Sequence, residues 1–137
     1  MAEERKISAY YREIALDLIN NRPELAHIKN SNATITYLTS EYEKKAQGNL
    51  VLGLTEKVPT KNKWAIPSDF TITIYLENIK HFTKDQEVIL MLHELLHIGI
   101  DKEGKTYIKP HDLEDFRAII DEYGAYWDKP LEVANNE

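Results

Sequence analysis

Residues 83–99 constrain the fold more than any other part of the chain. Thr83, with Gln86 three residues later, forms the pattern of a capping box, which marks the first turn of a helix. Gly99 is placed to end that helix. The positions between them are apolar over most of the helical surface: Val88, Ile89, Leu92, Leu95, Leu96 and Ile98. We therefore expect a buried core helix, around which the other elements must pack.

Patterns on either side of this helix predict a small sheet and outer helices. Residues 71–76 alternate between apolar and polar positions and give the clearest strand, with weaker strands expected over 33–38, 50–54 and 63–66. Helical spacing predicts a first helix over 3–20, a short second helix from Pro23 to Ile28, and a last helix over 112–123. The expected fold is α+β, with three to four mostly antiparallel strands packed against the core helix.

The length and composition exclude several classes of protein. The 137 residues suit one domain over 1–137, with a helical N-terminal segment over 1–30 and a frayed tail over 130–137. No cysteine is present, so disulfides and cysteine-held zinc are excluded. A net charge of −6 argues against nucleic acid as a partner, and Lys57, Lys61 and Lys63 are interpreted as a solvated loop. The chain shows no targeting signal or membrane span, which predicts a soluble cytoplasmic protein.

Three polar residues, His93, Glu94 and His97, interrupt the apolar core helix. Positions four apart share one face of a helix, so both imidazoles could hold one metal ion. Glu94 could act as a general base that takes a proton from a metal-activated water and returns it to a leaving amine. This spacing is the HExxH arrangement of zinc metallopeptidases. The alternative is a pair of core histidines whose polar atoms are satisfied without a metal.

A catalytic zinc site needs a third protein ligand and leaves one position for water. Ile100 and Glu103 stand where the metzincin class has Gly and His, so that class is disfavoured. His111 is preferred, because a neutral imidazole is a good zinc ligand. Asp112 or Asp115 could then accept the other ring N–H of His111, although acids in a first helical turn are favoured by the helix dipole alone. The full set of candidates for the third ligand is Glu103, His111, Glu114, Asp115 and Glu122.

Two segments, His93-Glu94-Leu95-Leu96-His97-Ile98 and His111-Asp112-Leu113-Glu114-Asp115-Phe116, together resemble the putative phage metallopeptidase family. The resemblance extends from the strand at Thr71 to Tyr123, and residues 48–67 lie outside it. It implies a minimal zincin-like fold, bound zinc, a peptide or protein substrate and, for a phage-encoded chain, the host cytoplasm. It also implies that His93, His97 and His111 are metal ligands and that Glu94 is the general base.

The sequence therefore predicts a zinc-dependent peptidase, in which an extended peptide could add to the edge of the strand over 71–76. Two alternatives stay open. The histidine pair also resembles part of the three-histidine metal endoribonucleases of ribosome maturation, but Glu103 stands where their third histidine is expected. A non-catalytic alternative is a zinc-stabilised regulatory or protein-binding module of a phage, of the inhibitor or anti-repressor type. The oligomeric state is not predicted by any of these patterns.

Overall fold

The computed structural model describes residues 4–109 of the 137-residue chain. Both helices and strands occur through this range. The helices are α1 (Ala9–Asn21), η1 (Pro23–Leu25), α2 (Ala26–Lys29), η2 (Thr60–Asn62), η3 (Leu76–Ile79) and α3 (Lys84–Leu95). The strands are β1 (Lys6–Ile7), β2 (Ile35–Ser40), β3 (Lys45–Ala46), β4 (Asn49–Leu50), β5 (Gly53–Lys57), β6 (Phe70–Tyr75), β7 (Ile98–Ile100) and β8 (Thr106–Ile108). The predicted α+β class is confirmed.

A mixed four-stranded sheet in the order β1-β2-β6-β5 forms the centre of the described fold. The two outer pairings are antiparallel and the central pair, β2 and β6, is parallel, so the sheet is mostly antiparallel as expected, with one parallel pair at its centre. Two small antiparallel ribbons, β3-β4 and β7-β8, complete the strands. Strand β6 lies between two neighbours, and β5 therefore forms one edge of the sheet.

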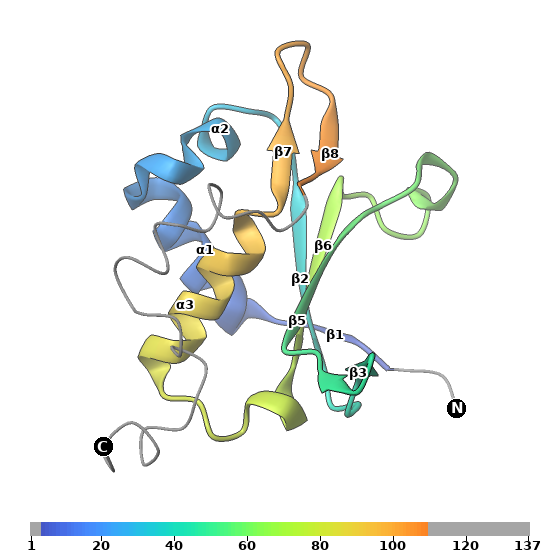
Figure 1. The fold of residues 1–137 in the computed structure, drawn as a ribbon. Helices are drawn as coiled ribbons and strands as arrows, with labels where there is room; N and C mark the ends of the chain where they lie inside the picture. Colours follow the sequence, from blue (N-terminus) through green and yellow to red (C-terminus); the bar gives the residue numbers. More distant parts are fainter. Residues whose placement is uncertain (1–3, 110–137) are drawn as a thin grey trace.

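The helices α1, α2 and α3 lie on one side of this sheet, and the core forms between them and the strands (Figure 1). Every residue of β6 is buried, because Phe70, Ile72 and Ile74 contribute to the core and the opposite side of the strand is also covered. Helix α3 packs against both α1 and β5. The helix with the most apolar sequence is thus the helix that contacts the edge strand.

The first helix begins later than the sequence pattern predicted. Ser8 is its N-cap, and the Ser8 hydroxyl accepts a hydrogen bond from the backbone N–H of Tyr11 at 3.2 Å. Lys6 and Ile7 instead form β1, where Ile7 is 82% exposed. The helical spacing of Ile7 was therefore misleading, since a serine cap at the next residue ends the extended segment. The short helix predicted from Pro23 is present as η1 followed by α2.

Three other predictions about helices and strands were wrong, because strand pairing or turns form where the sequence pattern indicated another element. The core helix ends at Leu95 and not at Ile98, because residues 98–100 pair with 106–108, and Gly99 is therefore a strand residue and not a cap. No strand forms over 63–66, where turns follow η2. Residues 50–54 are divided between β4 and β5. The predicted last helix and the predicted frayed tail lie outside the described residues.

No helix within residues 4–109 is long and apolar enough to cross a membrane.

The capping box of α3 should contribute measurably to stability. The Thr83 hydroxyl accepts from the N–H of Gln86 at 3.2 Å, and the Gln86 side-chain carbonyl accepts from the N–H of Thr83 at 2.8 Å. We expect Thr83→Ala to lower the free energy of unfolding by about 1 kcal/mol, measured by urea denaturation. Thr83→Ser, which keeps the hydroxyl, is the control. Equal stability of the alanine and serine variants would contradict this role.

Candidate metal and catalytic site

The HExxH residues lie together at the C-terminal end of α3. His93 and Glu94 belong to its last turn, and His97 follows just beyond the C-cap, Leu96. The imidazole rings of His93 and His97 have centroids 5.3 Å apart and meet edge to face at 75°. One possible ligand atom from each of His93, Glu94 and His97 lies within 4.8 Å of the other two. The structure thus brings together the three residues that the sequence singled out on this helix.

Glu94 is buried against the edge strand β5. Its side chain is only 4% exposed, and the hydroxyl of Thr55 donates to carboxylate Oε1 at 2.7 Å. The same hydroxyl lies 3.0 Å from the backbone carbonyl of Glu94. Burial raises the pKa of Glu94 to about 7, and the hydrogen bond from Thr55 opposes part of that rise. A carboxyl group with a pKa near neutrality can exchange a proton at physiological pH.

Gly53 allows β5 to come this close to the carboxylate. A Cβ atom built on Gly53 would lie 3.0 Å from Oε2 of Glu94 and 3.1 Å from its Cδ and Cγ. These are tighter than ordinary van der Waals contacts, so a larger residue would displace the carboxylate. Glycine within a strand often marks a close approach of another group, and here the approaching group is the catalytic candidate.

The main chain beyond β8 orients the ring of His97. Nδ1 of His97 lies 2.8 Å from the carbonyl oxygen of Lys109, and the N–H of Lys109 donates to the His97 carbonyl at 2.6 Å. Because a carbonyl can only accept, Nδ1 carries the proton, and Nε2 is the nitrogen with the lone pair. A hydrogen bond from one ring nitrogen to a carbonyl is how metal-binding histidines are commonly oriented.

The donor set fits a zinc ion. Imidazole nitrogens and carboxylate oxygens are ordinary zinc ligands, with bonds of about 2.0–2.2 Å. Two ligands of one ion therefore lie within about 4 Å of each other, a separation that small side-chain rotations could produce from the observed cluster. The tautomer of His97 presents Nε2 for coordination. His93 and His97 are accordingly the described residues suited to hold the metal, with Glu94 beside them.

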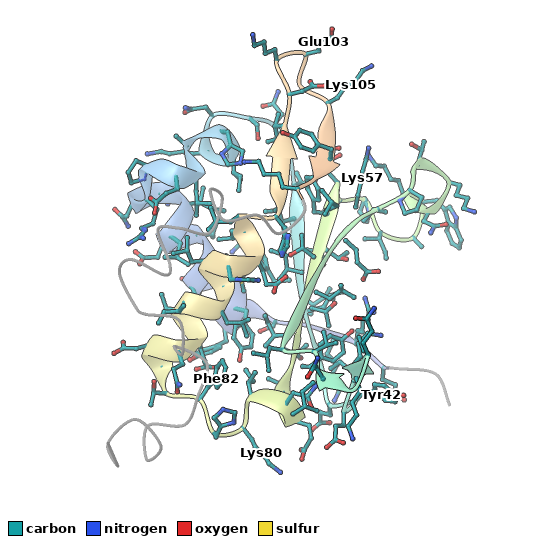
Figure 2. All side chains as sticks on the ribbon, in the orientation of Figure 1. Tyr42, Lys57, Lys80, Phe82, Glu103 and Lys105 are labelled. Carbon is teal, nitrogen blue, oxygen red and sulfur yellow. The ribbon has the colours of Figure 1, made fainter. Side chains whose placement is uncertain are left out.

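None of the sequence-predicted candidates for the third ligand belongs to this cluster within residues 4–109. His111, Asp112, Asp115, Glu114 and Glu122 all lie outside the described residues. Glu103 lies at the tip of the β7-β8 ribbon, away from α3 (Figure 2), with its side chain 77% exposed and 3.9 Å from Lys105. Among the described residues, the cluster around His93 and His97 does not include Glu103.

The motif gave no indication of Thr55 or of the Lys109 carbonyl, because both come from other parts of the chain. Only Gly53 carried a usable signal, since a glycine in a predicted strand suggests close packing of another group against the backbone.

A model of the family described as putative phage metallopeptidase matches residues 4–135, which is nearly the whole chain. The chain belongs to the putative phage metallopeptidase family. The matched range includes residues 48–67, which lie outside the resemblance based on the two motif segments. No curated protein and no solved structure matches the chain. Membership of the putative phage metallopeptidase family implies a metal and a peptide or protein substrate.

The buried carboxyl group predicts a pH-dependent stability of the metal-free protein. The pKa of Glu94 is about 7 in the folded state, against an ordinary 4.5, so the folded protein retains a proton that the unfolded chain releases. The stability that Glu94 contributes is therefore fully present below pH 4.5 and is lost as the pH rises through about 7. We expect the free energy of unfolding of the wild type to fall, relative to Glu94→Gln, between about pH 5 and about pH 8.

Urea denaturation of both metal-free proteins at the two pH values measures this difference. Glu13→Gln removes one negative charge at an exposed position of α1 and should follow the wild type. A gap between wild type and Glu94→Gln that stays constant with pH would contradict the assigned ionisation.

Proposed function

We propose that the protein is a zinc-dependent peptidase with a zincin-like core. The observation that carries the proposal is the buried Glu94 carboxyl group, which lies beside two imidazoles and beneath an edge strand. Membership of a metallopeptidase family supports the same conclusion. The single domain over 1–137 and the location in the host cytoplasm stay predictions.

His93 and His97 would hold the zinc ion, and we propose His111 as the third protein ligand. Asp112 or Asp115 would accept the second ring N–H of His111 and so fix its tautomer. Glu114, Asp115 and Glu122 remain the competing candidates for the third position. When bound, zinc supplies a Lewis acid that polarises the scissile carbonyl and acidifies a water molecule.

Glu94 would carry the proton during hydrolysis. As a general base it takes a proton from the attacking water, and as a general acid it delivers that proton to the leaving nitrogen. In the metal-free protein burial raises the pKa of Glu94 to about 7, which supports a group that accepts and releases a proton near neutral pH. The Thr55 hydroxyl holds Oε1 in place during this exchange.

The edge strand β5, and not β6 as the sequence suggested, is where an extended peptide would bind. Strand β6 has a partner on each side, so it offers no edge. The N–H of Tyr75 donates to the Leu52 carbonyl, and the N–H of Val58 donates to the Asp69 carbonyl. Residues 52 and 58 thus hydrogen-bond toward β6, and so do the other even-numbered positions of β5, because every second residue of an antiparallel strand faces the same neighbour. The N–H and C=O groups of Gly53, Thr55 and Lys57 therefore point away from β6. No backbone group within residues 4–109 pairs with them, so a substrate backbone could pair with them directly beside Glu94.

Substitution of Glu94 tests the catalytic assignment. At saturating zinc, Glu94→Gln should still hold the metal through its histidines but lose turnover of an unfolded protein such as casein by about 10²–10⁴-fold. His97→Ala should lose both zinc and activity. Metal content by mass spectrometry and a fluorescent casein assay measure the two effects. Normal cleavage by Glu94→Gln would refute the general-base role, and zinc-loaded wild type with no peptidase activity would favour the non-catalytic regulatory module.

Substitution of His111 tests the third ligand independently. We expect His111→Ala to bind zinc at least about tenfold more weakly, in line with the loss of one coordinating group. Glu114→Ala, Asp115→Ala and Glu122→Ala are the comparison variants, and competition with a chromogenic chelator gives the affinities. Unchanged affinity in His111→Ala, with a loss in one of the acidic variants, would transfer the ligand role to that residue.

A further inference from the structure

A cavity of about 750 Å³ lies at the Lys57 end of β5, away from the HExxH cluster. Its wall includes the β7-β8 ribbon, represented by Ile100 and Thr106, and the segment that leads from α2 to β2, represented by Ser31 and Ala33. The loop after β5 closes another side. The cavity therefore lies at the point where the edge strand meets the ribbon that continues from His97.

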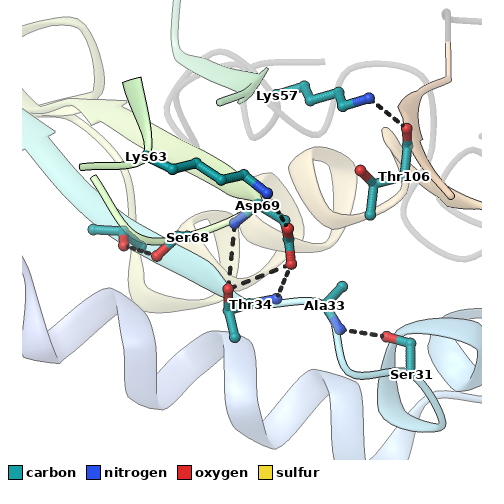
Figure 3. A network of polar contacts seen from close by, with 9 residues as sticks. Ser31, Ala33, Thr34, Lys57, Lys63, Ser68, Asp69 and Thr106 are labelled. Atoms are coloured by element: carbon teal, nitrogen blue, oxygen red, sulfur yellow. Dashed lines mark hydrogen bonds and ion pairs between the residues drawn. The ribbon is translucent and has the colours of Figure 1, made fainter. Parts of the chain in front are cut away.

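Among the described residues, four lysines line this cavity in a chain whose net charge is −6: Lys57, Lys63, Lys102 and Lys105. The ammonium group of Lys57 donates to the backbone carbonyl of Thr106 at 2.9 Å, which is a neutral acceptor (Figure 3). Lys105 is 77% exposed and only 3.9 Å from Glu103, a contact that contributes little in water. The positive charges of Lys57 and Lys105 are thus not strongly compensated by these contacts.

The acidic residues of the wall are already engaged. Asp69 forms an ion pair with Lys63 at 2.9 Å and accepts from the N–H of Thr34 at 3.0 Å (Figure 3). Asp101 uses Oδ1 to accept from two backbone N–H groups, those of Glu103 at 2.9 Å and Lys105 at 2.8 Å. These contacts hold the two carboxylates in the wall, and the part of the lining formed by residues 4–109 keeps an excess of positive charge.

Lys57 connects this cavity with the catalytic candidate. Side chains two apart on a strand lie on the same face, so Lys57 points to the same side of β5 as Thr55, which contacts Glu94. The two residues are separated by about 7 Å along the strand. A peptide paired with β5 above Glu94 would therefore reach the cavity within about two residues of the bond to be cleaved.

We propose that this cavity is a specificity subsite that binds the carboxylate of an aspartate or glutamate side chain in the peptide substrate, with Lys57 as its principal contact. The assignment of the ligand as a substrate side chain rests on the proposed peptidase function. The site itself is defined by the lysines and the cavity, so its affinity for a carboxylate can be measured without turnover.

The first experiment measures that affinity by NMR on the uniformly ¹⁵N-labelled full chain. The probe is N-acetylglutamate N-methylamide, and the matched neutral probe is the corresponding glutamine compound. We expect saturable shifts of the amides around Lys57 and Thr106 with the acid only, and affinity about tenfold weaker in Lys57→Met. Lys80→Met removes the same charge at the opposite end of the molecule (Figure 2) and should bind like the wild type.

Shifts that are scattered, equal for both probes, or unaffected by Lys57→Met would overturn the proposal. Tighter binding of inorganic phosphate than of the glutamate probe by tenfold or more would overturn the carboxylate assignment. Binding should also weaken as the salt concentration rises, because the attraction is between charges near the surface.

The second experiment separates the subsite from the catalytic proposal. Zinc-loaded Glu94→Gln is titrated with two peptides that differ only in one Glu or Gln, and zinc-loaded wild type is tested for cleavage of a peptide library. Tighter binding of the acidic peptide that is lost in Lys57→Met and kept in Lys80→Met supports the subsite. If the wild type then cleaves no peptide, only the peptidase function is refuted. Cleavage without any acidic preference would refute the subsite and leave the peptidase function standing.

Discussion

The contact between Thr55 and Glu94 joins the two parts of the molecule on which the site depends. It fixes the end of the core helix α3 against the edge strand β5, with the hydroxyl 2.7 Å from the carboxylate. Gly53 permits the contact, because any larger residue there would meet the carboxylate. The result is an acid whose position relative to the sheet edge is set by both main chain and side chain. A substrate paired with that edge would meet the acid in a fixed place.

The sequence was most informative where structure is determined locally. The capping box at Thr83 and Gln86 located the start of α3, and alternation located β6 to within one residue. The end of α3 was missed because residues 98–100 pair with 106–108, and the helical spacing of the preceding residues does not encode this pairing with the next strand. The parallel pairing of β2 with β6 joins residues 35 positions apart in sequence, which no local pattern encodes.

The candidate site, like the fold, was predictable only where local sequence determines it. The helical spacing of His93 and His97 is enough to predict that they converge, and the structure places them in ring contact. Their environment was not predictable, because Thr55 comes from a strand about 40 residues earlier and the Lys109 carbonyl from the end of a ribbon. A motif identifies the groups that could react. Only the tertiary fold determines which nitrogen of His97 carries a proton and how far the pKa of Glu94 rises.

The burial of the Glu94 carboxyl group has a free-energy cost in the metal-free fold. An apolar residue at that position would pack without the penalty of several kcal/mol that attends a buried ionised group. A single hydroxyl, that of Thr55, recovers only part of this penalty in the metal-free protein, and the pKa of about 7 reflects the remainder. A cation held by His93 and His97 would favour the ionised carboxylate, so metal binding and the charge on Glu94 should support each other. Under the proposed metal binding, the same coupling would offset the cost of placing His93 and Glu94 in the last turn of an apolar core helix, with His97 just beyond it.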